Sequence, residues 1–142
     1  MPRTAGSFCG GSVAGKTIAV LGVTFKPNTD DMRDSPSLVI VPALQGEGAK
    51  VRAFDPEGMK EAKKMMPDVT WCEDAYDTLQ GADVMVILTE WNEFRGLDLK
   101  RAKELMRQPL IVDLRNIFDP AQVSKAGFDY ASVGRAMIPA KR

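Results

Sequence analysis

The chain has 142 residues, and its content of 44% hydrophobic and 27% charged residues is typical of one globular domain. Lys and Arg together number 19, and Asp and Glu also number 19, a balance that argues against nucleic acid as a partner. The sequence has no histidine and only two cysteines, which excludes a His-dependent nucleophile and a zinc site built from His and Cys.

No apolar run approaches the roughly 18 residues of a membrane-spanning helix, and the first residues lack the apolar segment of a secretory signal. A chain without a disulfide framework also suits a reducing compartment. We therefore expect a cytoplasmic protein without a membrane partner.

Residues 1–15 are rich in Gly and Ser and are expected to be a flexible leader or linker remnant. From residue 16 onward, apolar segments of strand length alternate with segments of helical pattern. The strand segments are continuous apolar runs, which indicates a parallel sheet covered on both faces. The sequence thus predicts one α/β domain over 16–135, doubly wound and Rossmann-like, with a mostly parallel sheet of about five to six strands and helices on both faces, and a tail over 136–142. The expected strands are 17–22, 50–54, 69–72, 83–88, 110–114 and 129–133, and the expected helices are 35–45, 55–66, 73–80, 97–106 and 121–126.

Two polar residues followed by proline mark expected helix starts. Ser35 precedes Pro36 and Asp55 precedes Pro56, so each polar residue is expected to cap a helix whose first position is proline. Asp55 also ends the second expected strand, where an acid often binds a ribose hydroxyl. We favour the helix cap for Asp55 and keep the ribose contact as the alternative. Pro42 lies inside the first expected helix and should bend it.

Two cations follow expected strands. Lys26 lies in the loop after the first strand, and Arg115 follows the strand over 110–114. Because the carboxyl ends of parallel strands share one rim, the two side chains are suited to bind a phosphate or pyrophosphate together. The alternative is that both cations only order the loops through ion pairs. The acids considered as partners are Asp30, Asp31, Asp113 and Asp119.

The glycine-rich turn of dinucleotide-binding folds is absent, because Gly22 is followed by Val23, Thr24 and Phe25. We therefore expect phosphate to be held by side chains, and we expect no NAD binding of the usual kind. The rings of Phe25 and Trp91 are suited to stack on a base, but packing in the core or at its rim is favoured for both.

The two cysteines carry no predicted chemistry. Cys72 is expected to fill a core position, and Cys9 lies in the leader without a recognisable activating partner. We assign no catalytic residue and no metal site.

The segment over 22–37, with the sequence GVTFKPNTDDMRDSPS, resembles the signature that opens the C-terminal, UDP-binding domain of the UDP-glucose/GDP-mannose dehydrogenase family. Further matches follow in the same order: FDP at 54–56, AD at 82–83, TEW at 89–91, DLRN at 113–116 and VGR at 133–135. The resemblance covers roughly 15–135, and it favours the anion site over the ion pairs.

The resemblance implies a part in the oxidation of the C6 alcohol of a nucleotide sugar to a carboxylate with NAD. By motif position, Phe25, Lys26 and Arg115 match residues that contact the UDP-sugar. Arg33 matches an arginine that approaches the NAD, which is bound mainly by an N-terminal domain that this sequence lacks. The family's catalytic cysteine motif is also missing. We therefore expect the chain to be inactive alone, with the UDP-sugar and the other dehydrogenase domains as partners. We also keep a homo-oligomer among the expected partners.

Two other functions fit the residues less well. A Rossmann-like regulatory or assembly module without a ligand has no reason to keep Lys26, Arg33 and Arg115 on one rim. A phosphoacceptor receiver needs an acidic pair after its first strand and an aspartate at the end of its third, and the third expected strand ends at Cys72. We keep the ligand-free module as the alternative.

Overall fold

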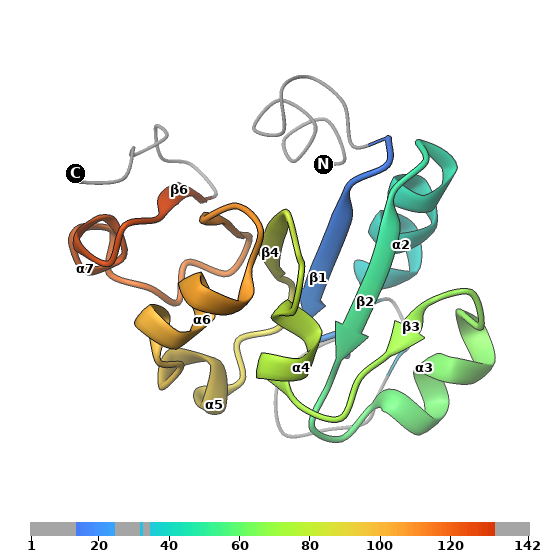
Figure 1. Cartoon of the computed structure of the whole chain (residues 1–142). Coiled ribbons are helices and arrows are strands. Elements are labelled where there is room, and N and C mark those ends of the chain that lie inside the picture. Colours follow the sequence, from blue (N-terminus) through green and yellow to red (C-terminus); the bar gives the residue numbers. More distant parts are fainter. Residues whose placement is uncertain (1–13, 25–31, 33–34, 133–142) are drawn as a thin grey trace.

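The computed structural model of the chain describes residues 14–24, 32 and 35–132 (Figure 1). Its centre is a six-stranded, all-parallel sheet in the order β3-β2-β1-β4-β5-β6. The strand order reverses between β1 and β4, which makes this the switch point of a doubly wound fold. The predicted fold class is therefore confirmed. The strands are β1 Thr17–Leu21, β2 Lys50–Phe54, β3 Thr70–Trp71, β4 Val84–Ile87, β5 Leu110–Asp113 and β6 Asp129–Ser132.

The helices cover both faces of the sheet, and alternate strand residues supply the two cores. In β1, Ile18 and Val20 pack in the core on the side of α2 and α3, while Ala19 and Leu21 pack in the core on the side of α4–α7. All four side chains are fully buried, which explains why β1 reads as one continuous apolar run. The helices are α2 Ser37–Gly46, α3 Met59–Met65, α4 Ala75–Leu79, α5 Asn92–Arg95, α6 Leu99–Leu105 and α7 Pro120–Lys125.

Four of the expected helices begin later in the chain than the sequence predicted, and hydrogen bonds explain the shift for two of them. The helix expected from Ser35 begins at Ser37, with Pro36 at its N-cap position. The hydroxyls of Ser35 and Ser37 both donate to the Val23 carbonyl oxygen, so Ser35 ties the helix start to the end of β1. The helix expected from Asp55 begins at Met59, because the Asp55 carboxylate closes a separate turn before it.

One helix was missed in the prediction. Helix α5 spans only four residues, and Phe94 is its one fully buried side chain. A single apolar residue gives no periodic pattern, so the sequence provides no helical signal there. Pro42 lies inside α2 as expected. No helix in the described part of the chain is long and apolar enough to cross a membrane.

The two ends of the strands form two edges that are used below. The carboxyl edge comprises the loops that follow β1, β2, β4 and β5, namely residues 22–24, 55–58, 88–91 and 114–118. The amino edge comprises the strand starts and the segments that lead into them, including 80–83 and 107–109.

Candidate functional site

Asp55 is a fully buried carboxylate that joins three loops of the carboxyl edge. Its Oδ2 atom accepts hydrogen bonds from the backbone N–H of Val23 (2.9 Å) and of Thr24 (3.2 Å) and from the Thr24 hydroxyl (3.1 Å). The Trp91 indole N–H also donates to Oδ2, at 3.2 Å. Its Oδ1 atom accepts from the N–H groups of Glu57 (3.0 Å) and Gly58 (2.7 Å). Asp55 thus caps a turn rather than a helix, and its burial removes the ribose contact.

The turn after β1 is closed at the point where a dinucleotide would approach a Rossmann fold. Gly22 has a φ of +86°, and a Cβ atom there would lie 2.6 Å from the Cβ of Thr89. The Thr89 hydroxyl donates to the Thr24 carbonyl oxygen at 2.8 Å. In addition, the N–H groups of Val23 and Thr24 bind the Asp55 carboxylate, so an internal anion occupies donors that a phosphate would need. This packing agrees with the missing glycine motif.

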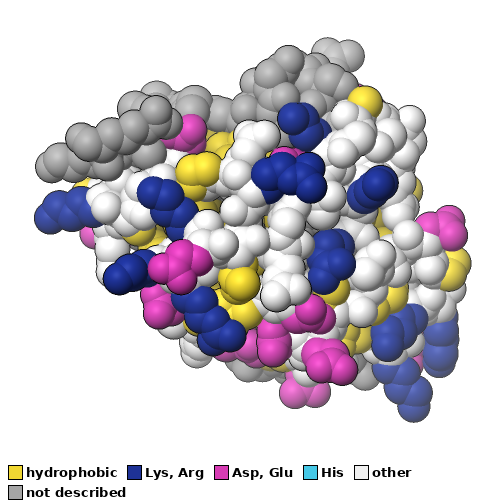
Figure 2. Space-filling model, viewed as in Figure 1, with side chains coloured by type: hydrophobic (Ala, Val, Ile, Leu, Met, Phe, Trp, Pro, Cys, Tyr) yellow, Lys and Arg dark blue, Asp and Glu magenta, His cyan; other side chains and the backbone are white. Residues whose placement is uncertain are grey.

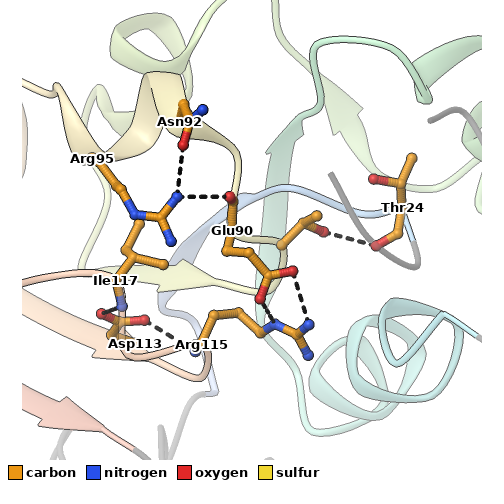
Figure 3. A network of polar contacts seen from close by, with 8 residues as sticks. Thr24, Glu90, Asn92, Arg95, Asp113, Arg115 and Ile117 are labelled. Atoms are coloured by element: carbon orange, nitrogen blue, oxygen red, sulfur yellow. Dashed lines mark hydrogen bonds and ion pairs between the residues drawn. The ribbon is translucent and has the colours of Figure 1, made fainter. Parts of the chain in front are cut away.

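Arg115 forms a two-point ion pair with Glu90 across the ends of β4 and β5 (Figure 3). Its Nε lies 2.8 Å from Glu90 Oε2, and its Nη2 lies 2.9 Å from Glu90 Oε1. The hydrogen bond from Arg115, opposed by partial burial, lowers the pKa of the Glu90 carboxyl. The same bond raises the pKa of the Arg115 guanidinium. The acids considered from sequence did not include Glu90, so the expected ion-pair partner was wrong.

The Arg115 guanidinium keeps one edge open. Glu90 takes the edge formed by Nε and Nη2, and a guanidinium also presents a second fork formed by Nη1 and Nη2. Among the residues that the structure describes, no side chain pairs with Nη1, and 34% of the Arg115 side chain is accessible. An outside carboxylate or phosphate therefore has a planar donor pair to bind.

Asp113, the last residue of β5, fixes the backbone of Arg115. Its Oδ1 accepts from the Arg115 N–H at 3.0 Å, and its Oδ2 accepts from the N–H groups of Ile117 (2.8 Å) and Phe118 (3.1 Å). The Tyr130 hydroxyl adds a fourth bond, at 2.8 Å. Asp113 is fully buried and, like Asp55, is satisfied by uncharged donors.

The remaining predicted residues divide into those that are described and those that are not. Trp91 is 7% exposed and packs in the core, which confirms packing as its role. Cys72 is buried as expected, and desolvation by burial raises the pKa of its thiol. The described residues hold no cluster of three or more metal-binding side chains. Phe25, Lys26, Arg33 and Cys9 lie outside the described residues, as do most of the expected leader and the whole expected tail.

The amino edge carries a pocket of about 280 Å³. Figure 2 shows Lys and Arg side chains, in dark blue, gathered over this part of the surface near the starts of β1 and β2. Its two arginines have acidic partners, since Arg52 lies 3.6 Å from Asp77 and Arg107 lies 3.7 Å from Asp83. The pocket is lined by Thr17, Lys50, Arg52, Thr70, Gln80, Gly81 and Arg107.

Comparisons with known proteins agree with the fold and with the sequence motifs. Residues 19–120 match the model of the UDP-glucose/GDP-mannose dehydrogenase family, UDP binding domain. The chain is 53% identical over 135 residues to UDP-glucose 6-dehydrogenase of Rhizobium meliloti, which covers 95% of this chain and 31% of that protein. It is 43% identical to UDP-glucose 6-dehydrogenase TuaD of Bacillus subtilis, over 90% of this chain and 28% of that protein.

Solved structures give the same picture. A UDP-glucose dehydrogenase from Pyrobaculum islandicum matches 79% of this chain and 24% of its own, with a TM-score of 0.68 and 32% identity. An NDP-N-acetyl-D-galactosaminuronic acid dehydrogenase from Methanosarcina mazei matches 93% of this chain and 27% of its own, with a TM-score of 0.80 and 28% identity. The chain therefore spans about a third or less of the length of these relatives.

Proposed function

The chain belongs to the UDP-glucose/GDP-mannose dehydrogenase family and matches its UDP-binding domain, and from this premise we propose that it binds the UDP part of a nucleotide sugar for a UDP-glucose 6-dehydrogenase. In that enzyme, UDP-glucose would be oxidised to UDP-glucuronate with NAD as the oxidant. The proposal takes residues 16–135 as the binding unit.

One observation carries the proposal: Arg115 presents an open guanidinium fork at the carboxyl edge of the sheet. In open α/β folds this edge is where ligands bind. A guanidinium fork matches the spacing of two phosphate oxygens and forms charge-assisted hydrogen bonds with them. The Val23 and Thr24 N–H groups already bind Asp55, so these two backbone donors are not available to a diphosphate, and Arg115 offers a side-chain donor instead.

Three further residues enter the proposal through the resemblance alone. Phe25 and Lys26 are proposed to contact the UDP-sugar beside Arg115. Arg33 is proposed to reach the NAD from this side of the cleft, while most of the NAD contacts come from another part of the enzyme. We assign no catalytic residue to the chain, and we expect no oxidation of UDP-glucose by these 142 residues alone.

We propose different roles for this chain and for the other domains of the enzyme. This chain would hold and orient the diphosphate, and orientation fixes the sugar relative to groups supplied elsewhere. NAD would accept the hydride in both oxidation steps of the whole enzyme. The tight packing of Gly22 against Thr89 supports a second domain as the main NAD site.

Calorimetric titration of the chain with UDP, with NAD as the control ligand, tests the proposal. We expect UDP to bind and Arg115→Ala to weaken it by about tenfold or more, because a charge-assisted hydrogen bond contributes about 1.5–3 kcal/mol. Lys26→Ala should weaken binding by a similar factor of about ten. Arg107→Ala is the matched control, since Arg107 also pairs with an acid but lies at the amino edge.

Two results would contradict the proposal. If UDP fails to bind, the ligand-free regulatory or assembly module gains weight over a nucleotide site. If Arg115→Ala and Arg107→Ala have equal effects on UDP binding, the carboxyl edge is not the binding surface.

A further inference from the structure

Glu90 places a negative charge beside the side chain that is proposed to bind a diphosphate. Its carboxylate lies 2.8 Å and 2.9 Å from two nitrogens of Arg115, and no other acid pairs with Arg115 among the described residues. We propose that Glu90 is a positioning residue: it holds one edge of the Arg115 guanidinium so that the other edge stays directed to the diphosphate. This inference rests on the proposed function.

The contact is suited to alignment because it uses one fork of the guanidinium. Glu90 binds Nε and Nη2 and leaves the fork formed by Nη1 and Nη2. A carboxylate centred on the Nη1 and Nη2 fork would instead compete with the ligand. The observed geometry therefore allows Glu90 and a phosphate to be bound by Arg115 together.

Glu90 is itself fixed from both sides along the chain. Before it, the Thr89 hydroxyl donates to the Thr24 carbonyl oxygen, and after it the Trp91 indole binds the buried Asp55 carboxylate. Arg95 donates to the Glu90 carbonyl oxygen at 3.2 Å and to the Asn92 side-chain oxygen at 2.8 Å (Figure 3). The carboxylate thus projects from a backbone segment that is held at three successive residues.

The backbone of Arg115 is also held by a hydrogen bond. Asp113 accepts the Arg115 N–H at 3.0 Å, so the backbone from which the long side chain starts is fixed. With both backbones fixed, the Glu90 contact decides where the guanidinium lies. Without Glu90, the side chain must be ordered when the ligand binds, and that ordering weakens binding by about three- to tenfold.

Positioning and simple electrostatics predict opposite effects for the substitution Glu90→Gln. Removal of a negative charge near an anion site tightens anion binding if only Coulomb forces act. If Glu90 aligns the Arg115 guanidinium, its loss weakens anion binding instead. Glu93 provides the matched control, because it lies on α5 close to Glu90 in the chain and is not a partner of Arg115.

The test is a set of UDP titrations of the 142-residue chain and its variants. We expect Glu90→Gln to weaken UDP binding about three- to tenfold and Glu93→Gln to leave it unchanged or slightly tighter. In the double variant with Arg115→Ala, Glu90→Gln should add no further loss, because its effect passes through Arg115. A merely structural role for Glu90 would weaken binding in both backgrounds.

A nuclear magnetic resonance measurement gives a second readout that does not depend on affinity. The Arg115 Nε–H signal should be protected from exchange in the free chain, should persist when UDP is bound, and should be lost in Glu90→Ala, which removes the acceptor. Disappearance of the signal on UDP addition would overturn the inference, because Glu90 would then be a competitor that the ligand displaces.

The titrations distinguish a failure of the positioning role from a failure of the proposed function. If Arg115→Ala weakens UDP binding but Glu90→Gln does not, the positioning role is wrong and the proposed function stands. If the unaltered chain does not bind UDP, or if Arg115→Ala has no effect, the proposed function is wrong and the positioning role with it.

Discussion

The buried acids at the two edges of the sheet have different hydrogen-bond partners. At the carboxyl edge, Asp55 and Asp113 are fully buried and are satisfied by backbone N–H, hydroxyl and indole donors. At the amino edge, the buried Asp83 accepts the Thr17 N–H at 2.9 Å and also pairs with Arg107, whose side chain is 65% exposed. Because neutral donors satisfy Asp55 and Asp113, neither buried acid pairs with the Arg115 guanidinium, whereas at the amino edge the buried Asp83 pairs with Arg107.

The same contrast extends to Arg52 and Arg115. The Arg52 guanidinium donates to the carbonyl oxygens of Asp77 and Thr78 and so binds β2 to α4. Arg115 is held by one side chain and keeps a fork open. Arg52 lies in the middle of β2 and Arg115 lies beyond the end of β5, and the partners of each guanidinium decide its role.

The largest expected difference between the two edges is the loss of stability when a buried carboxylate is removed. We expect Asp55→Ala to lower the free energy of unfolding by more than about 3 kcal/mol, because it leaves several buried donors from three loops without acceptors. Asp83→Ala should lose less, about 1–2 kcal/mol, because its donors lie closer to solvent and Arg107 returns to water. Urea unfolding of both variants checks the difference, and equal losses would show that the edges are equivalent.

Two of the glycines with positive φ, Gly22 and Gly81, give a second comparison. Gly22→Ala should lower the free energy of unfolding by about 2–4 kcal/mol, because this φ is strained for alanine and the added Cβ collides with Thr89. Gly81 at the amino edge has a φ of +70° but open space around its Cβ position. Gly81→Ala should therefore cost about 1 kcal/mol from strain alone. Thermal unfolding of the pair measures the packing term, and similar losses would argue against close packing at the switch point.

A single hydroxyl tests the support of the Arg115 loop. Tyr130→Phe should destabilise the fold by about 1–1.5 kcal/mol, because a buried bond to Asp113 is lost while three N–H donors remain. Tyr76→Phe is the control, because the Tyr76 hydroxyl accepts the Asp98 N–H in an exposed position. Chemical denaturation should give a clearly smaller loss for Tyr76→Phe, and the reverse order would contradict a buried Tyr130 bond.

The smallest expected effect is the pH dependence of the ion pair. Because the hydrogen bond from Arg115 holds the folded pKa of Glu90 below its ordinary value, the stabilisation by this pair is complete above the ordinary pKa and is lost as the pH falls through the folded pKa. For a partly exposed pair the contribution is less than about 1 kcal/mol. Glu90→Gln should therefore make the acid limb of the stability curve shallower.

Glu93→Gln should change the pH dependence of stability in the opposite direction. Desolvation and nearby acids raise the pKa of Glu93, so its charge opposes folding above that pKa. This substitution should make the acid limb steeper, and a parallel change in both variants would show that Glu90 and Arg115 are not specifically coupled.

The elements that the sequence predicted well are those with local signals. β1 (TIAVL) is an apolar, β-branched run, while β2 (KVRAF) carries Val51, Ala53 and Phe54 beside two basic residues, and the structure places both strands within one residue of the predicted ranges. The parallel sheet followed from the same runs. Arg115 was predicted to lie at the carboxyl edge because its distance from the preceding strand is a local property, and the structure confirms that place.

The elements that the sequence did not predict depend on contacts between distant segments. Glu90 and Arg115 are 25 residues apart, and Asp55 binds Val23 across 32 residues. No spacing rule marks such pairs in one sequence. The backbone N–H groups that hold Asp55 and Asp113 are present at almost every residue, so the choice of donor is settled only when the loops pack together.

Because the Trp91 indole binds Asp55, the fluorescence of Trp91 is a probe of the carboxyl edge. The chain has two tryptophans, and they lie in different surroundings: Trp91 is 7% exposed beside Glu90, and Trp71 is half-buried on the outer strand β3. Fluorescence from Trp91 should be shielded from water-soluble quenchers, while Trp71 is reached by them. Emission that survives quenching therefore reports on the carboxyl edge of the sheet without any added label.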